Sequence, residues 1–105
     1  MKVDEKIKEA GMDVSGCTAN VVFITSTQIF CANAGDSRAT MKNNNAENQT
    51  VPLSFDHKPN DEKEKNRIIA AGHSVMMDRV DGSLALSRAF GDLEYKDRDD
   101  LTPQQ

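Results

Sequence analysis

Cys17-Thr18-Ala19-Asn20-Val21-Val22-Phe23-Ile24-Thr25 and Ile29-Phe30-Cys31-Ala32-Asn33-Ala34 are the two stretches that decide the fold. Each is apolar at successive positions, which in an extended chain places apolar side chains on both faces, as in a central strand. The polar residues 26–28 between them suit a short turn, and Gly35-Asp36 breaks the second stretch. The two stretches therefore predict an antiparallel hairpin.

Two helices are predicted outside this hairpin. Residues 3–10 carry apolar side chains at helical spacing, and Gly11 follows where a left-handed helix stop favours glycine. Residues 60–71 predict the second helix, with Asn60 as its N-cap and Gly72 as its stop. Acidic residues at its start suit the positive end of the helix dipole.

Two further hairpins are indicated by turn-forming residues. The polar residues 43–49 have poor strand propensity and lie between better strand formers, so they predict a loop at the tip of an expanded hairpin. Residues 74–80 predict a strand, and residues 83–86 its returning partner. The connecting Asp81-Gly82 suits a two-residue type I′ turn, because both central residues of that turn need positive φ.

The composition predicts one soluble globular unit with a small core. The chain has 105 residues, 37% of them hydrophobic, and a formal net charge of -4. Its longest apolar stretch is far shorter than the ~20 residues that span a bilayer, and no signal region opens it, so we expect a cytoplasmic location and no membrane contact. The acidic balance and the lack of a Lys/Arg block argue against a nucleic-acid partner.

The two cysteines do not form a recognisable metal site. Cys17 and Cys31 are too few for a zinc cage, which takes four nitrogen or sulfur ligands. Each has small or apolar neighbours, so both are predicted to be buried free thiols.

Five motifs follow one another in an order typical of a known enzyme family. They are Ser15-Gly16-Cys17-Thr18-Ala19, Ala32-Asn33-Ala34-Gly35-Asp36-Ser37-Arg38, Asp56-His57-Lys58-Pro59, Glu64-x-x-Arg67-Ile68-x-x-Ala71-Gly72 and Arg79-Val80-x-Gly82-x-Leu84-Ala85-x-Ser87-Arg88-Ala89-x-Gly91-Asp92, with Tyr95-Lys96 after the last. One such motif is weak evidence, but the full set over residues 15 to 96 resembles the type-2C (PPM-type) metal-dependent protein serine/threonine phosphatases.

The resemblance implies an α+β fold, as part of an antiparallel β-sandwich with flanking helices and a flap hairpin. Along the chain it implies a helix stub over residues 1–14, sandwich strands over 15–55, the flap and its following segment over 56–96, and a flexible tail over 97–105. His73 stands where the family has a second glycine. If that position needs positive φ, His73 carries a strain of ~1 kcal/mol or more.

The chemistry that the resemblance implies is hydrolysis of phosphoserine or phosphothreonine by a water activated between two Mg or Mn ions. The family holds these ions with an N-terminal acidic element that includes a phosphate-binding arginine, a DGHG motif, and C-terminal DG and DN motifs. This sequence contains none of the four. It does contain Asp81-Gly82, but this pair aligns with a turn and not with the metal-binding DG motif. We therefore assign no catalytic residue.

Asp36 is the metal ligand that the resemblance does carry over, because it matches an aspartate linked to an additional, weaker metal site in the family. The alternative for a Gly-Asp-Ser sequence is a turn in which Asp36 pairs with Arg38 or a backbone amide. A single carboxylate leaves Mg with mostly water ligands, so we expect no tightly bound Mg or Mn in this chain alone.

Four other polar residues have both a functional and a structural interpretation. Arg88 is the candidate contact for a substrate phosphate, with an Arg88–Asp92 structural pair as the alternative. For His57 a local hydrogen bond at the base of the flap is favoured over a role as general acid, and for His73 a favourable charge at a helix end over catalysis. Ser87 lacks the Gly-x-Ser-x-Gly elbow, which rejects a serine hydrolase.

Two interpretations of the whole chain remain. In the first, it is the truncated middle of a phosphatase that acts on phosphoproteins, inactive alone because most metal ligands are absent; related domains continue past residues 101–105. In the second, it is a catalytically dead module of the same fold that docks on a phosphatase, a kinase substrate or a copy of itself. Both predict self-association, as a dimer or by strand exchange, because partial sheets leave apolar faces and unpaired edges.

Overall fold

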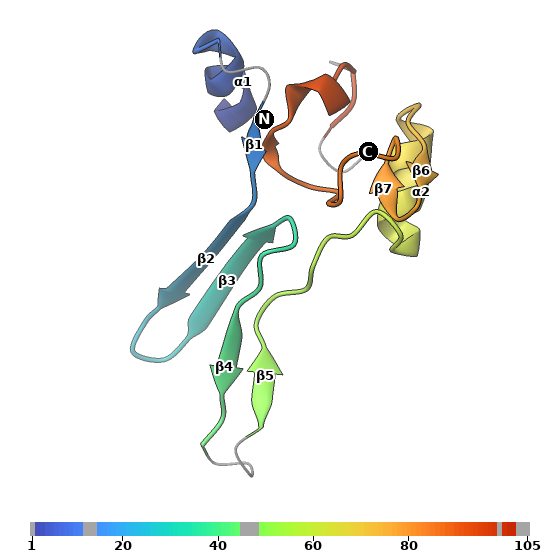
Figure 1. Cartoon of the computed structure of the whole chain (residues 1–105). Helices are drawn as coiled ribbons and strands as arrows, with labels where there is room; N and C mark the ends of the chain where they lie inside the picture. The colour runs from blue at the N-terminus through green and yellow to red at the C-terminus, as the bar shows by residue number, and fades with distance from the viewer. Residues whose placement is uncertain (1, 12–14, 45–48, 99, 103–105) are drawn as a thin grey trace.

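The computed structural model of the chain describes residues 2–11, 15–44, 49–98 and 100–102. Over these residues the fold is α+β, as predicted, with helices beside short antiparallel strand pairs (Figure 1). In chain order the elements are α1 (Lys2–Glu9), β1 (Gly16–Cys17), β2 (Ala19–Ile24), β3 (Ile29–Ala34), β4 (Thr40–Lys42), β5 (Thr50–Pro52), α2 (Glu62–Ala70), β6 (Val75–Met76), β7 (Arg79–Val80), β8 (Phe90–Gly91) and the 3-10 helix η1 (Leu93–Tyr95).

β2 and β3 form the antiparallel hairpin that the two apolar stretches predict. Ala19 lies opposite Ala34 and Ile24 opposite Ile29, and the turn is closed where the backbone N–H of Thr25 donates to the carbonyl of Gln28. Because side chains alternate along each strand, the register gives the hairpin two apolar faces. We call them the Phe23 face (Val21, Phe23, Phe30 and Ala32) and the Ile24 face (Val22, Ile24, Ile29 and Cys31).

The hairpin does not become the interior strand pair that its composition predicts. Phe23 is 64% and Ile24 68% exposed, so little of the described chain packs over the faces of the hairpin at these positions, and no third strand extends the sheet among the described residues. In that part of the chain the buried hydrophobic side chains are Ile68 and Val80, each 5% exposed. The core is therefore smaller than the composition suggests.

The cysteine prediction is half right. Cys17 and Cys31 are free, as expected, but Cys17 is exposed and Cys31 only half-buried. Burial was predicted from their small or apolar neighbours in sequence, but many of the large apolar residues of these strands are themselves exposed.

The molecule is elongated rather than compact. Its extents are 47 × 32 × 21 Å and its radius of gyration is 16.0 Å, whereas a compact domain of this length has a radius of about 13 Å. Figure 1 shows the reason, because the β2–β3 and β4–β5 hairpins extend away from the part that carries the helices and the C-terminal segment.

The β4–β5 hairpin agrees with the predicted hairpin around the polar residues 43–49. Met41 lies opposite Val51, and the N–H of Asn43 donates to the carbonyl of Gln49. The tip of the predicted loop, residues 45–48, lies outside the described residues. So do parts of the predicted helix stub and tail, whose bounds remain predictions.

Both predicted helices form. α1 is followed by Gly11 at φ 71°, and α2 is followed by Gly72 at φ 99°. The N-cap of α2, however, is Asp61 and not Asn60. Asn60 lies inside a turn in which the N–H of Asp61 donates to the carbonyl of Lys58, so the helix begins one residue later.

The flap hairpin turns at a different dipeptide from the predicted one. β6 and β7 are joined by Met77-Asp78, with φ values of 51° and 60°. Asp81 and Gly82 also have positive φ, as predicted, but they belong to a second turn in which Val80 pairs with Leu84 by a single bridge. The strain proposed for His73 is absent, because the non-glycine residues with positive φ in the described chain do not include it.

The two ends of the described chain meet. β1 pairs with β8, so that Gly16 lies opposite Gly91. Asp4 of α1 accepts from the N–H of Gly91 and from the ammonium of Lys96, each at 2.9 Å. A side chain at Gly91 would collide with the carbonyl oxygen of Ser15, 2.3 Å from where its Cβ would lie, so this close approach needs glycine.

Candidate functional site

Asp36 lies in the turn that ends β3. Its carboxylate accepts from the ammonium of Lys58 at 2.5 Å, and the two side chains are 29% and 40% exposed. The alternative partner named from the sequence, Arg38, pairs instead with Asp56 at 2.8 and 2.9 Å. These hydrogen bonds lower the pKa of Asp56. The motif that contains Lys58 was visible in the sequence, but its contact with Asp36 spans 22 positions and has no local signal.

Gly35 brings the Asp36 turn close to a distant segment of the chain. It has φ 106°, and a Cβ here would lie 2.3 Å from the Thr18 methyl carbon and 2.8 Å from the carbonyl oxygen of Arg88. Both the backbone conformation and the lack of space therefore require glycine.

His57 holds this turn by hydrogen bonds in both directions. The N–H of Gly35 donates to His57 Nδ1 at 3.1 Å, and the N–H of His57 donates to the carbonyl of Gly35 at 3.0 Å. The carbonyl of His57 accepts from the N–H of Ser87 at 3.1 Å. A backbone amide only donates, so Nδ1 is unprotonated and the neutral ring carries its proton on Nε2. This geometry agrees with the structural interpretation of His57.

Glu64 is the central charged group of the site, and the sequence did not single it out. It is 5% exposed and accepts from Arg67 at 3.0 Å, from the Ser87 hydroxyl at 2.8 Å and from Arg88 at 2.9 and 2.8 Å. Burial alone would raise the pKa of Glu64, but the hydrogen bonds from Arg88, Ser87 and Arg67 outweigh it and lower the pKa to about 2. The only sequence feature that could have pointed to Glu64 as a site residue was its position at the start of the Glu64-x-x-Arg67 motif.

Arg88 is directed at this carboxylate. The guanidinium group of Arg88 forms a bidentate ion pair with Glu64, and the Arg88 side chain is 26% exposed. The structural alternative for Arg88 was an ion pair with Asp92. In the described part of the chain the ion pair of Arg88 is instead with Glu64. The Ser87 hydroxyl also donates to Glu64.

His73 does not join these residues. Its Nδ1 lies 2.7 Å from Asp81 and its Nε2 3.7 Å from Asp97. The pKa of Asp81 is lowered, first by the backbone N–H of Ser74 and then by His73. His73 thus contacts the second turn of the flap rather than the end of α2 alone.

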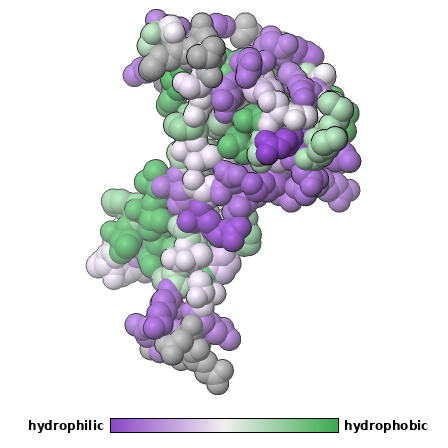
Figure 2. All heavy atoms as spheres, in the orientation of Figure 1, coloured by the Kyte–Doolittle hydropathy of each residue, from purple (hydrophilic) through white to green (hydrophobic). Residues whose placement is uncertain are grey.

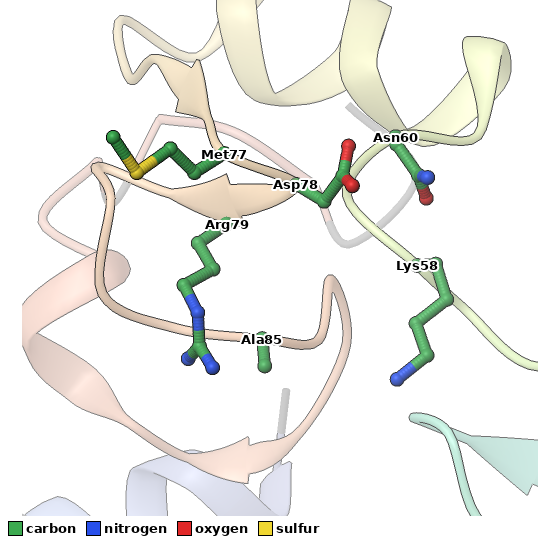
Figure 3. A pocket seen from close by; sticks show the side chains of 6 residues that line it. All are labelled: Lys58, Asn60, Met77, Asp78, Arg79 and Ala85. Carbon is green, nitrogen blue, oxygen red and sulfur yellow. The ribbon is translucent and has the colours of Figure 1, made fainter.

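A shallow cavity of about 340 Å³ lies beside the Asp36–Lys58 pair. Figure 3 shows that it is bordered by the flap turn on one side and by the chain leading to α2 on the other, with the charged ends of Lys58 and Arg79 directed to the same side. Its lining residues are Lys58, Asn60, Met77, Asp78, Arg79 and Ala85.

The described side chains do not complete a two-metal centre. Asp36 suits one ligand position of a Mg or Mn ion, because it is a partly exposed carboxylate at the end of a strand. Across residues 2–11, 15–44, 49–98 and 100–102, however, no group of three or more His, Cys, Asp or Glu residues is placed to hold a metal ion. Two-metal hydrolysis needs several converging ligands, so no catalytic step can be derived from these residues alone.

None of the helices within the described residues is both long and apolar enough to cross a membrane.

We predict that Glu64→Gln lowers the free energy of unfolding at pH 7 by roughly 2–4 kcal/mol, because it leaves the partly buried guanidinium groups of Arg67 and Arg88 without their counter-charge. The pKa of Glu64 is about 2 in the folded chain, against an ordinary 4.5. Ionised Glu64 therefore stabilises the fold above pH 4.5, and this contribution is lost as the pH falls through 4.5 towards 2. Urea unfolding at several pH values should show wild type and variant converging in that window, whereas exposed Glu62→Gln, the control, should follow wild type throughout.

We predict that His57→Ala destabilises the chain by roughly 1–3 kcal/mol, because the N–H of Gly35 loses its acceptor. His57→Asn should restore most of this loss, since the Asn Oδ1 can accept in place of Nδ1. Thermal unfolding measures the stability, and amide hydrogen exchange at Gly35 reports on the bond itself. Equal exchange at Gly35 in the two variants would show that the ring nitrogen does not hold the turn.

Comparison with known sequences agrees with the motifs. The family described as Protein phosphatase 2C matches residues 1–105. Protein phosphatase 2C homolog 2 of Aspergillus fumigatus is 51% identical over 102 residues, which are 97% of this chain and 22% of that protein. Protein phosphatase 2C homolog 2 of Schizosaccharomyces pombe is 55% identical over 94 residues, 89% of this chain and 25% of that protein. The chain thus spans about a quarter of the length of these relatives.

A solved structure agrees with the fold. The crystal structure of a phosphatase from a pathogenic strain of Toxoplasma gondii matches with a TM-score of 0.62 and 32% sequence identity, over 86% of this chain and 38% of that one. The family match extends over all the motifs and over the Asp36 and Glu64 sites described above. The chain belongs to the protein phosphatase 2C family.

Proposed function

We propose that this chain forms one segment of a Mg- or Mn-dependent protein serine/threonine phosphatase that acts on phosphoproteins. The family match over residues 1–105 carries this proposal. Within the segment, Asp36 offers a carboxylate to a metal ion, and Arg88 contacts the substrate phosphate. A cytoplasmic location is part of the same proposal, supported by the two free thiols, which suit a reducing compartment.

The contacts of both proposed site residues define what binding requires. Asp36 is paired with Lys58, so a divalent ion at this carboxylate replaces or shares an existing positive charge. Arg88 is paired with Glu64, so a phosphate reaches its guanidinium beside a carboxylate that already orients it. Both residues are partly exposed, which leaves room for this sharing.

The chain by itself is proposed to be inactive. Phosphate-monoester hydrolysis is among the slowest uncatalysed reactions, and its enzymes reach accelerations of up to ~10²¹. The described residues offer Asp36 but no converging set of ligands. In this proposal the other ligands come from other parts of the phosphatase domain.

With a phosphothreonine peptide and Mn²⁺, we expect the 105-residue chain to release no more phosphate than its Asp36→Ala variant. Mn²⁺ binding, followed by electron paramagnetic resonance, should be weak and should disappear in Asp36→Ala. Asp56→Ala, which removes a carboxylate paired with Arg38, is the matched control and should bind as wild type does. Equal binding by the two variants would refute the role of Asp36, and turnover abolished by Asp36→Ala would refute inactivity.

A second candidate function is a binding module that associates with a copy of itself. The specific observation is the exposed surface of 7583 Å², whereas a folded monomer of 11.6 kDa exposes about 5,800 Å². We predict that size-exclusion chromatography with light scattering will show a dimer or a larger species. A monomer at every concentration tested would reject this candidate and leave the phosphatase proposal untouched.

A further inference from the structure

The imidazole ring of His73 lies between two carboxylates that come from different parts of the chain. Its Nδ1 is 2.7 Å from Asp81, in the second turn of the flap, and its Nε2 is 3.7 Å from Asp97, in the chain after η1. The His73 side chain is 18% exposed, so most of the ring is shielded from solvent. A glycine, which the family has at this position, would make neither contact. The arrangement therefore depends on the residue by which this sequence departs from the family pattern.

Both carboxylates belong to segments that other contacts hold in place. The backbone N–H and the hydroxyl of Ser74 donate to Asp81 at 2.8 and 2.9 Å. Lys96, which precedes Asp97, is anchored by hydrogen bonds to α1 and to the backbone just before β8. The His73 ring thus bridges two anchored segments, the flap and the chain after η1.

The contact with Asp81 decides which nitrogen of the ring carries a proton. The backbone N–H of Ser74, and after it His73, lower the pKa of Asp81, which keeps this carboxylate ionised. An ionised carboxylate only accepts hydrogen bonds, so at 2.7 Å Nδ1 is the donor and carries a proton. In the neutral ring Nε2 then has a lone pair directed at Asp97, whereas in the charged ring Nε2 carries an N–H. Only the proton on Nε2 is gained and lost.

The other charged groups near His73 leave this effect in place. They line the cavity of about 910 Å³ that His73 shares with α1, α2 and the chain after β8. Four of the cations there are already in ion pairs with acidic residues, namely Arg67, Arg88, Lys96 and Arg98. On α1 the charge of Lys8 is matched by Glu5 three positions earlier. Asp92 and Glu94 add negative charge, so the surroundings favour a cationic ring.

We propose that His73 is a proton-sensitive link between the flap and the chain after η1. With a proton on Nε2, the ring pairs with Asp81 and Asp97 together and holds the two segments against each other. Without it, Nε2 and Asp97 present two acceptors to each other and the segments separate more readily. Because a histidine changes its charge within the range of about pH 5 to 8, mild acid tightens the link. No metal ion or substrate group enters this inference, so it does not rest on the proposed function.

The size of the effect is limited by solvent. Asp97 is 69% exposed, and Figure 2 shows a largely hydrophilic surface on the part of the molecule that carries the helices. Ion pairs in contact with water contribute little, and we expect the ratio of linked to separated molecules to change by about two- to fivefold.

Amide hydrogen exchange in the 105-residue chain tests the link. The N–H groups of Tyr95 and Lys96 donate the backbone hydrogen bonds of η1. We expect their protection factors, which correct for the intrinsic pH dependence of exchange, to be about two- to fivefold higher at about pH 5.5 than at about pH 8. Asp97→Asn, at an exposed position, should abolish this difference. Glu94→Gln, which neutralises an exposed acid in the same 3-10 helix, is the matched control and should behave as wild type. Glu64 is ionised at both pH values, because its pKa is about 2.

A second variant and a direct reading of the tautomer complete the test. His73→Asn keeps a side-chain N–H for Asp81 but cannot change charge, so it should lose the pH dependence while circular dichroism shows the fold retained. Imidazole ¹⁵N chemical shifts at about pH 8 should place the proton of His73 on Nδ1, in contrast to His57, which carries its proton on Nε2.

Three results would overturn the proposal. They are equal protection at the two pH values in wild type, a pH difference that survives in Asp97→Asn or His73→Asn, and a neutral His73 with its proton on Nε2. Phosphatase activity enters none of these measurements, so the enzymatic proposal is tested separately.

Discussion

The buried carboxylate of Glu64 is the interaction on which the arrangement of the site depends. It binds Arg67 of its own helix and reaches Ser87 and Arg88 in a segment more than 20 positions away. From Ser87 the contacts continue through the backbone to His57 and then to Gly35, next to Asp36. The carboxylate of Glu64 on α2 is thus connected, through a series of hydrogen bonds, to the turn at the end of β3 that contains Asp36.

Polar contacts matter so much here because the apolar core is small. Among the described residues two hydrophobic side chains are buried, while the larger apolar side chains of β2 and β3 remain exposed. Burial of apolar surface is normally the main stabilising term, so a chain that buries little relies on specific hydrogen bonds and on surfaces that a partner can cover. The same feature explains the elongated shape and the uncovered Phe23 face.

Local patterns predicted the elements well and their surroundings poorly. The β2–β3 hairpin, both helices and the position of Asp36 at a strand end follow from periodicity and turn residues over a few positions. The burial of Cys17 and the interior role of Phe23 were wrong, because strand composition does not say whether neighbouring strands are present. The flap turn moved to Met77-Asp78, a dipeptide without the usual turn preference, because Asp81 is held by Ser74 and His73. Lys58 was missed since its partner Asp36 is 22 positions away, and Glu64 was missed since Ser87 and Arg88, two of its three partners, are more than 20 positions away.

Because Asp36 is paired with Lys58, the conformation of the turn that contains Asp36 does not depend on a bound metal ion. An unpaired carboxylate at a tight bend would repel nearby acidic groups unless a cation were bound beside it. Here the ammonium group of Lys58 is that cation. In proteins whose ligands are unpaired without metal, chelation unfolds the structure. The bend at Asp36 is held by side-chain and backbone contacts of the chain itself, so in the proposal made above a metal ion at Asp36 would compete with the ammonium group of Lys58 and would not be needed to shape the bend.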